Sequence, residues 1–236
     1  MANISSTGIV REIIELHSVG STNTVALDSG RPGLLVVASE QTAGRGRKGR
    51  TWFSPAGTNL YMTLTVDTND PRLPLVAGVA VREALSELMV KSALPEVKWP
   101  NDLIVHGRKL CGILCESRGG ITAVGIGVNV NQLAWPPDLT DSATSLSLIL
   151  GREVQRQEVL RLVLTEVEKW LFIFARQGFE PVRRNYLEHG LLKSYALTTE
   201  EGVPCSVVDM NSDGHLLINA AGTLKELVSG SIRIIP

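Results

Sequence analysis

Hydrophobic and polar residues alternate over short distances through much of the chain, which is the pattern of β-strands. Apolar or alternating segments of this kind lie at 13–19, 34–39, 60–66, 96–99, 103–105, 109–116 and 121–130. Several of them are separated by tight polar turns, among which His106-Gly107 and Gly119-Gly120 are the expected hairpin connections. The sequence therefore predicts a set of strands that are joined largely as antiparallel hairpins.

Helical periodicity is present in three further segments, at 74–91, 154–177 and 181–189. In the first of them, apolar residues recur near helical spacing and charged residues fall between them. These helices stand beside hairpins and do not alternate regularly with single strands. The pattern therefore favours an α+β fold, with a mixed or antiparallel sheet flanked by helices.

The end of the chain has a different texture, with short β-type segments at 203–209, 216–220 and 231–235 between glycine and aspartate turns. Three or four strands within so short a stretch suggest a small barrel. We therefore predict two domains, a larger one over 1–190 and a small β-domain over 191–236.

Composition narrows the class of protein. The chain has 236 residues, 44% of them hydrophobic, which is enough for one good core. Its 23 Lys and Arg residues against 24 Asp and Glu residues argue against a protein that coats nucleic acid by general electrostatics. We see no signal peptide, and no run near the roughly 18 apolar residues of a membrane span. These features predict a soluble, cytoplasmic protein with neither nucleic acid nor a membrane as partner.

The three cysteines, Cys111, Cys115 and Cys205, are too few and too dispersed for a disulfide framework. Cys111 and Cys115 lie on one face of an expected strand, but a metal site would need more ligands nearby. We expect them to be small buried apolar residues, and we assign no metal ligand in the chain.

One segment has little reason to fold by itself. Residues 44–50 read Gly-Arg-Gly-Arg-Lys-Gly-Arg, with four cations and three glycines in seven positions. Glycines allow backbone N–H groups to approach an anion closely, and arginines add forked donors. The spacing also resembles a dinucleotide fingerprint and a P-loop, but both require a helix to begin at the loop. Pro55 and Gly57 argue against such a helix, so we predict an anion-binding loop, with a solvated charged turn as the alternative.

Four other segments combine polar side chains with expected strand ends. They are Ser-Thr-Asn at 21–23, Lys-Trp-Pro-Asn-Asp at 98–102, Lys-Leu-Cys-Gly-Ile-Leu at 109–114 and Gly-Ile-Gly-Val-Asn-Val-Asn at 125–131. The first offers neutral hydrogen-bonding groups, or alternatively caps a helix that starts at Thr24. The two asparagines of the last are expected on one face, because strand side chains repeat every two residues.

Together these segments, in this order and approximate spacing, resemble the biotin protein ligase family. The resemblance is strong over residues 20–131 and general in the C-terminal third. It implies a mixed sheet flanked by helices, with an SH3-like C-terminal domain. It further implies ATP-dependent attachment of biotin, with Mg²⁺ and through biotinoyl-5′-AMP, to one lysine of a biotin carboxyl carrier protein. The expected type is monofunctional, without an N-terminal DNA-binding domain. The sequence does not decide between a monomer and a homodimer.

The resemblance also assigns site residues. The biotin-binding positions would be Ser21, Thr22, Asn23, Gln41, Arg45, Gly46, Arg47 and Lys109. The positions that bind ATP and the adenylate would be Arg50, Trp52, Lys98, Asn101, Asn129 and Asn131, with Asp102 beside them. The catalytic positions would be Arg47, Lys98, Asp102 and Lys109, of which Asp102 would orient the acceptor amine. The basic loop would close over biotin and the adenylate, excluding water.

Two alternatives differ from this interpretation. A lipoate or octanoate ligase of related fold would bind a substrate without a ureido head, whereas Ser21, Asn23 and Gln41 suit that head. A module that binds a small molecule or nucleic acid without turnover would use the basic loop alone. One departure from the family concerns the C-terminal domain, where Ser231 follows Gly230 in place of a frequent acidic residue.

Overall fold

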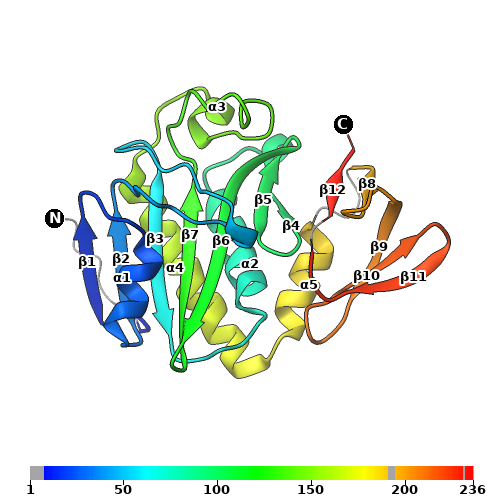
Figure 1. The fold of residues 1–236 in the computed structure, drawn as a ribbon, viewed down its shortest axis with the longest axis horizontal. Helices are drawn as coiled ribbons and strands as arrows, with labels where there is room; N and C mark the ends of the chain where they lie inside the picture. The colour runs from blue at the N-terminus through cyan, green and yellow to red at the C-terminus, as the bar shows by residue number, and fades with distance from the viewer. Residues whose placement is uncertain (1–7, 191–194, 231, 236) are drawn as a thin grey trace.

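The computed structural model describes residues 8–190, 195–230 and 232–235. A large sheet with helices on its faces lies beside a smaller sheet that the end of the chain forms (Figure 1). This arrangement confirms the predicted α+β class with a second, C-terminal β-domain.

The large sheet has seven strands in the order β1-β2-β3-β7-β6-β5-β4. β1 runs parallel to β2, and every other neighbouring pair is antiparallel. The predicted segments match these strands with ends that differ by a few residues. The strands are β1 (Glu12–Leu16), β2 (Leu34–Ala38), β3 (Leu60–Val66), β4 (Glu96–Lys98), β5 (Asp102–Val105), β6 (Arg108–Arg118) and β7 (Ile121–Val128).

Five α-helices are present in the described residues. They are α1 (Thr22–Ser29), α2 (Leu73–Ser86), α3 (Leu146–Leu150), α4 (Arg156–Gln177) and α5 (Glu180–His189). α2 is shorter than predicted. Leu88 and Met89 continue its apolar pattern in the sequence, but they pack on the core from a turn that follows the helix. α1 begins at Thr22, two residues earlier than the alternative considered from the sequence. None of these helices is long and apolar enough to cross a membrane.

Alternation along the central strands gives the large sheet two different faces. Met62, Leu64 and Ile126 point to one face and belong to the main apolar core together with residues of α2 and α4. Thr63 and Gly125 point to the opposite face, which we call the site face. α1 covers the end of the site face near β2, where Ala26 packs in a small separate core. Beside α1, the site face borders a cavity.

The C-terminal sheet has five antiparallel strands in the order β11-β10-β9-β8-β12, consistent with the expected SH3-like domain. They are β8 (Leu197–Thr198), β9 (Pro204–Met210), β10 (Leu216–Ala220), β11 (Thr223–Leu227) and β12 (Arg233–Ile234). β8 is too short to show periodicity, and β11 is largely exposed, so the sequence pattern indicated neither. The proposed boundary at 190/191 adjoins residues 191–194, which lie outside the described residues.

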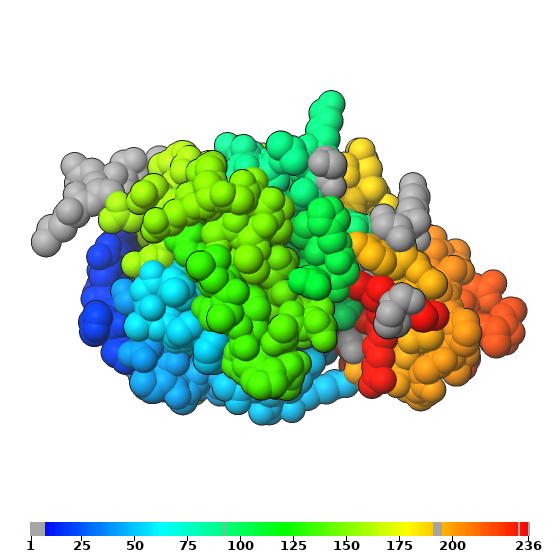
Figure 2. Space-filling view, turned by 90° about the horizontal axis from the view of Figure 1, so that it is seen from above, coloured from blue at the N-terminus to red at the C-terminus, as the bar shows by residue number. Residues whose placement is uncertain are grey.

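The C-terminal domain packs directly on the larger one (Figure 2). Met210 and Leu216 belong to the same continuous core as the residues of α2 and α4. Trp99 Nε1 donates to the carbonyl of Gly214 at 3.0 Å, and an Arg72 guanidinium nitrogen donates to the carbonyl of Ser212 at 3.0 Å. The position of the small domain is therefore fixed by apolar packing and by hydrogen bonds.

Candidate active site

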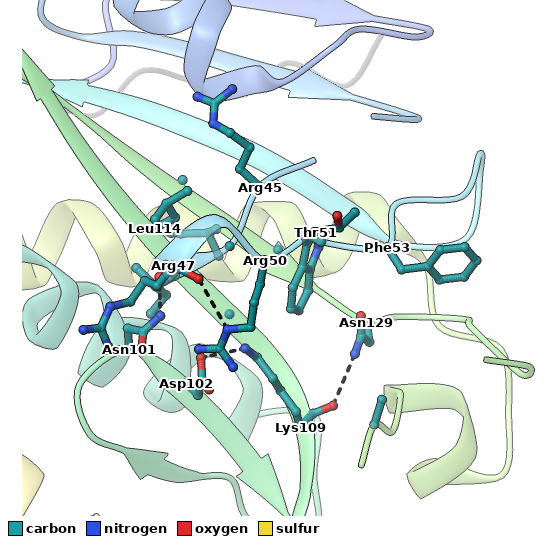
Figure 3. A pocket seen from close by; sticks show the side chains of 18 of the residues that line it. Arg45, Arg47, Arg50, Thr51, Phe53, Asn101, Asp102, Lys109, Leu114 and Asn129 are labelled. Atoms are coloured by element: carbon teal, nitrogen blue, oxygen red, sulfur yellow. Dashed lines mark hydrogen bonds and ion pairs between the residues drawn. The ribbon is translucent and has the colours of Figure 1, made fainter. Parts of the chain in front are cut away.

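A cavity of about 510 Å³ lies on the site face, within the ~300–1,000 Å³ usual for small-molecule sites. The basic loop lies over it (Figure 3). The C-terminal domain contributes Arg233 and Ile234 to its wall. Every residue that the sequence assigned to the site lines this cavity except Asn131. The predicted residues, which come from five separate segments of the chain, are thus brought to one place.

Glycines form the floor of the cavity. Gly112 in β6 and Gly127 in β7 are paired neighbours beneath the indole of Trp52. A Cβ atom at Gly127 would lie 2.5 Å from Trp52 Nε1, and one at Gly112 would lie 2.9 Å from Trp52 Cζ3. A Cβ at Gly125 would collide with the amide of Asn23. Because these three positions are glycines, the side chains of Trp52 and Asn23 can lie directly against the strands.

A network of neutral hydrogen bonds occupies the end of the cavity near α1. Gln41 Oε1 accepts from the Thr22 backbone N–H at 2.9 Å and from its hydroxyl at 3.1 Å. The Thr63 hydroxyl donates to Asn23 Oδ1 at 2.7 Å, and Gln41 Nε2 donates to Ser54 Oγ at 3.1 Å. These bonds fix the orientation of both amide side chains. The result is a rigid set of neutral donors and acceptors at this end.

Glu116 connects this network to the basic loop. Its carboxylate accepts from Asn23 Nδ2 at 2.7 Å and forms an ion pair with Arg45 at 2.8 Å. Arg45 also donates to the Thr24 hydroxyl at 2.9 Å, so its side chain extends toward α1 and away from the other loop arginines (Figure 3). The sequence analysis did not identify Glu116, because an acidic residue late in a strand carries no signal by itself.

The basic loop is held by its own backbone. Gly46 N–H donates to the Arg50 carbonyl at 2.7 Å, and Trp52 N–H donates to the Gly44 carbonyl at 2.9 Å. Within it, residues Arg47–Gly49 make one 3₁₀ turn and no helix follows. The rejection of a P-loop and of a dinucleotide fingerprint is therefore confirmed.

The far end of the cavity is cationic. Of the six cationic side chains that line the cavity, all except Arg45 lie toward this end, and Asp102 supplies the one carboxylate among the described lining residues. Burial is the main cause that lowers the pKa of Lys98, and it likewise lowers the pKa of Arg47. Lys109 Nζ lies 2.7 Å from Asp102 Oδ1 and 5.1 Å from the centre of the Trp52 ring. This excess of positive charge suits a polyanion.

A β-bulge between β5 and β6 aims Lys109 into the cavity. Ile104 pairs with Lys109, but the preceding Leu103 pairs with Cys111, so Leu110 is an extra residue on β6. In a regular strand Lys109 would share the face of Cys111, which is the buried face. Because of the bulge, its side chain lies beside Gly112 on the site face.

The two asparagines after β7 differ in position. Asn129 lines the cavity, and its amide donates to the Lys109 carbonyl at 3.2 Å and to the Thr144 carbonyl at 3.0 Å. Asn131 instead exchanges two hydrogen bonds with the backbone of Val154, at 2.9 and 3.0 Å. β7 ends at Val128, before both residues, so the two-residue period no longer places them on one face.

Several cavity residues carried no signal in the sequence analysis. Trp135, Leu139 and Ala143 lie in the segment that follows β7 and form part of the wall. The Trp135 indole N–H is buried and has no partner among the described residues, so it can donate to a ligand. An isolated tryptophan in a proline-rich segment gave no basis for this assignment. The glycines of β6 and β7 could have been recognised, because Gly125 and Gly127 alternate in an otherwise apolar strand.

The cysteines take no part in the cavity. Cys111 is fully buried and Cys115 packs against the core, as expected from the sequence. Burial raises the pKa of the Cys115 thiol to about 12 and raises that of Cys111 as well. Neither thiol is therefore activated as a nucleophile. In the described part of the chain, no three His, Cys, Asp or Glu residues are grouped to hold a metal ion.

Comparison with known proteins agrees with this site. Residues 16–132 match the biotin/lipoate A/B protein ligase family. The bifunctional ligase/repressor BirA of Bacillus subtilis is 32% identical over 91% of this chain and 70% of the relative. The biotin–[acetyl-CoA-carboxylase] ligase of Paracoccus denitrificans is 38% identical over 73% of this chain and 78% of the relative.

A solved structure shares the whole architecture. The biotin protein ligase of Aquifex aeolicus in complex with biotin and ATP has a TM-score of 0.84 and 32% identity, covering 95% of this chain and 99% of that one. Fold and site thus define a ligase of the biotin/lipoate class. Within that class, the chain belongs to the biotin protein ligase family.

Proposed function

We propose that this chain activates biotin with ATP to biotinoyl-5′-AMP and then transfers biotin to a lysine of a biotin carboxyl carrier protein. One observation carries the proposal: the cavity has a fixed neutral network near α1, with Arg45 beside it, and its other five cations lie toward the opposite end. A molecule with a neutral polar head and a carboxylate would span these ends, with the nucleotide phosphates at the cationic end.

The neutral end suits the ureido head of biotin. The head has N–H donors and one carbonyl acceptor, and each would cost about 1–3 kcal/mol if buried without a partner. Ser21, Thr22 and Asn23 are buried at the start of α1, and Gln41 lies beside them. Because these groups are neutral and held in place, they bind without the desolvation cost of a charge.

The cationic end suits the first reaction. A biotin carboxylate oxygen attacks the α-phosphorus of ATP, the bond to the β-phosphate oxygen breaks, and pyrophosphate leaves. Two anions must approach each other, so catalysis depends on positioning and on positive charge where negative charge develops. Arg47, Lys98 and Lys109 supply that charge in the cavity. Trp52 and Trp135 offer indole surfaces for the nucleotide.

Mg²⁺ fits this arrangement as a companion of ATP. Mg²⁺ usually keeps several waters and binds substrate phosphates with one or two carboxylates. Asp102 is the one carboxylate in the described lining, so it would be the protein ligand, directly or through water. The ion would neutralise phosphate charge during the first reaction.

In the second reaction the acceptor amine attacks the carbonyl carbon of the adenylate, AMP leaves, and an amide bond forms with release of a proton. The amine must be neutral and directed at that carbon. Asp102 is our candidate for orienting it, since the carboxylate lies in the cavity 2.7 Å from Lys109 Nζ. The carrier protein would present its lysine at this point.

The test is pyrophosphate release on mixing the protein with ATP and Mg²⁺ and with either biotin or lipoate. We expect release that depends on biotin, and none above background with lipoate. Addition of a biotin carboxyl carrier domain should then yield a biotinylated lysine detectable by mass. Equal release with the two acids, or adenylate formation without transfer to any carrier domain, would contradict the proposal.

A further inference from the structure

The basic loop, residues 44–50, contacts the C-terminal domain at two places. Lys48 Nζ lies 2.7 and 3.0 Å from the two carboxylate oxygens of Glu200, in the turn between β8 and β9. Arg47 donates to the carbonyl of Gly230, beyond β11, at 3.3 Å. In the space-filling view the light-blue part of the chain reaches the orange and red domain along the lower edge (Figure 2).

Lys48 differs from the other cations of the loop. Arg45, Arg47 and Arg50 line the cavity, whereas Lys48 is not among the lining residues. Its backbone has φ 56°, a left-handed conformation that is strained for a residue with a side chain. In this turn the Lys48 side chain points to Glu200, whereas the neighbouring Arg47 and Arg50 side chains line the cavity. Because Lys48 does not line the cavity, its charge acts on the C-terminal domain and not on a ligand.

We propose that Glu200 is a positioning residue, which through Lys48 holds the basic loop against the C-terminal domain and so closes the cavity. That domain also supplies Arg233 and Ile234 to the wall, so a loop fixed to it closes the space between the two domains. The consequence for the reaction rests on the proposed function: a closed loop retains the adenylate until the acceptor lysine arrives.

The strength of the contact suits a reversible closure. The side chains of Lys48 and Glu200 are 54% and 33% exposed, so the ion pair is screened and contributes modestly. A stronger contact would oppose the opening that substrates and products require. The second contact, from Arg47 to Gly230, uses a backbone carbonyl, so the hydrogen bond itself does not require a carboxylate at position 200.

Trypsin reports on the loop without requiring activity. We would score cleavage of the Arg50–Thr51 bond in the full chain for wild type, Glu200→Gln and the control Glu201→Gln. Glu201 lies in the same turn and is exposed. We expect Glu200→Gln to accelerate cleavage about two- to fivefold, as befits a partly exposed ion pair. Glu201→Gln should match wild type, and the exchange Lys48→Glu with Glu200→Lys should restore slow cleavage.

The second measurement is the fraction of biotinoyl-5′-AMP that escapes into solution. Glu200→Gln should raise it at an unchanged KM for biotin, and the exchanged pair should lower it again. Equal cleavage in Glu200→Gln and Glu201→Gln, or no rescue by the exchange, would overturn the assignment. A wild-type protein that makes no adenylate would refute the proposed function instead, and the trypsin result would still decide the role of Glu200.

Discussion

Lys109 shows how one side chain acquires several roles through its surroundings. Its ammonium is paired with Asp102, lies over the Trp52 ring and adds to the positive field of the cavity. The sequence indicated a lysine at the start of an apolar strand, and the family resemblance assigned it to biotin. The structure adds its partner Asp102. The expected biotin contact of Lys109 and the expected orientation of the acceptor amine by Asp102 therefore involve the same ion pair.

We predict that Lys109→Ala raises the KM for biotin by about 10- to 100-fold, the equivalent of one charge-assisted hydrogen bond. The KM for ATP should change much less, because the other cations remain. Steady-state pyrophosphate release at varied biotin and varied ATP measures both constants. Lys169→Ala is the control, since Lys169 is half-exposed and pairs with Glu166 on α4, away from the cavity. Equal increases in the two constants would remove Lys109 from the biotin site.

At the scale of elements, the site depends on irregularities in the central strands. The bulge in β6 turns Lys109 to the site face, and the glycines of β6 and β7 leave room for the Trp52 indole. Strand positions followed from alternation in the sequence. The bulge did not, because it is a property of the pairing of β6 with β5 and leaves the local pattern of residues unchanged.

We predict that Gly127→Ala lowers kcat/KM at least tenfold, because its Cβ would overlap the Trp52 indole and displace it from the floor. Tryptophan fluorescence should change together with the activity. Gly20→Ala is the matched control, since no atom lies within 4 Å of its Cβ position and its φ is not positive. A Gly127→Ala enzyme with wild-type kinetics would show that the position of the indole is unimportant.

At the scale of the whole molecule, Arg72 is one of the residues that join the two domains. Arg72 forms a bidentate ion pair with Asp70, stacks on Phe174 and Phe179, and donates to the Ser212 carbonyl in the C-terminal domain. The predicted helices and strands did not indicate this contact, since it joins segments 140 residues apart. This packing fixes the position of the small domain, and with it the part of the cavity wall that Arg233 and Ile234 form.

We predict that Arg72→Met lowers the free energy of unfolding by about 1–2 kcal/mol at neutral pH. The hydrogen bond from Arg72 is the main cause that lowers the pKa of Asp70 from 3.8. A lowered carboxyl pKa stabilises the fold above the unfolded value, and this contribution is lost as the pH falls through the folded value. The difference from wild type should therefore shrink at acidic pH. Urea unfolding at neutral pH and at pH about 3 measures it.

The control for this prediction is Arg31→Met, which removes a more exposed ion pair with Glu12. It should change stability by less than about 0.5 kcal/mol at either pH. An Arg72→Met variant with wild-type stability, or with a loss that is the same at both pH values, would contradict the role assigned to the Arg72–Asp70 pair.

The sequence by itself determined the strands of the large sheet, the long helices and the chemical types in the site, because periodicity and glycine content are local properties. It also excluded a helix after the basic loop. Only the tertiary structure decided which face Lys109 occupies, that Asn131 binds Val154 while Asn129 lines the cavity, and that Lys48 meets Glu200 across 152 residues. Those outcomes depend on pairing register and domain packing, which bring together residues that no local pattern relates.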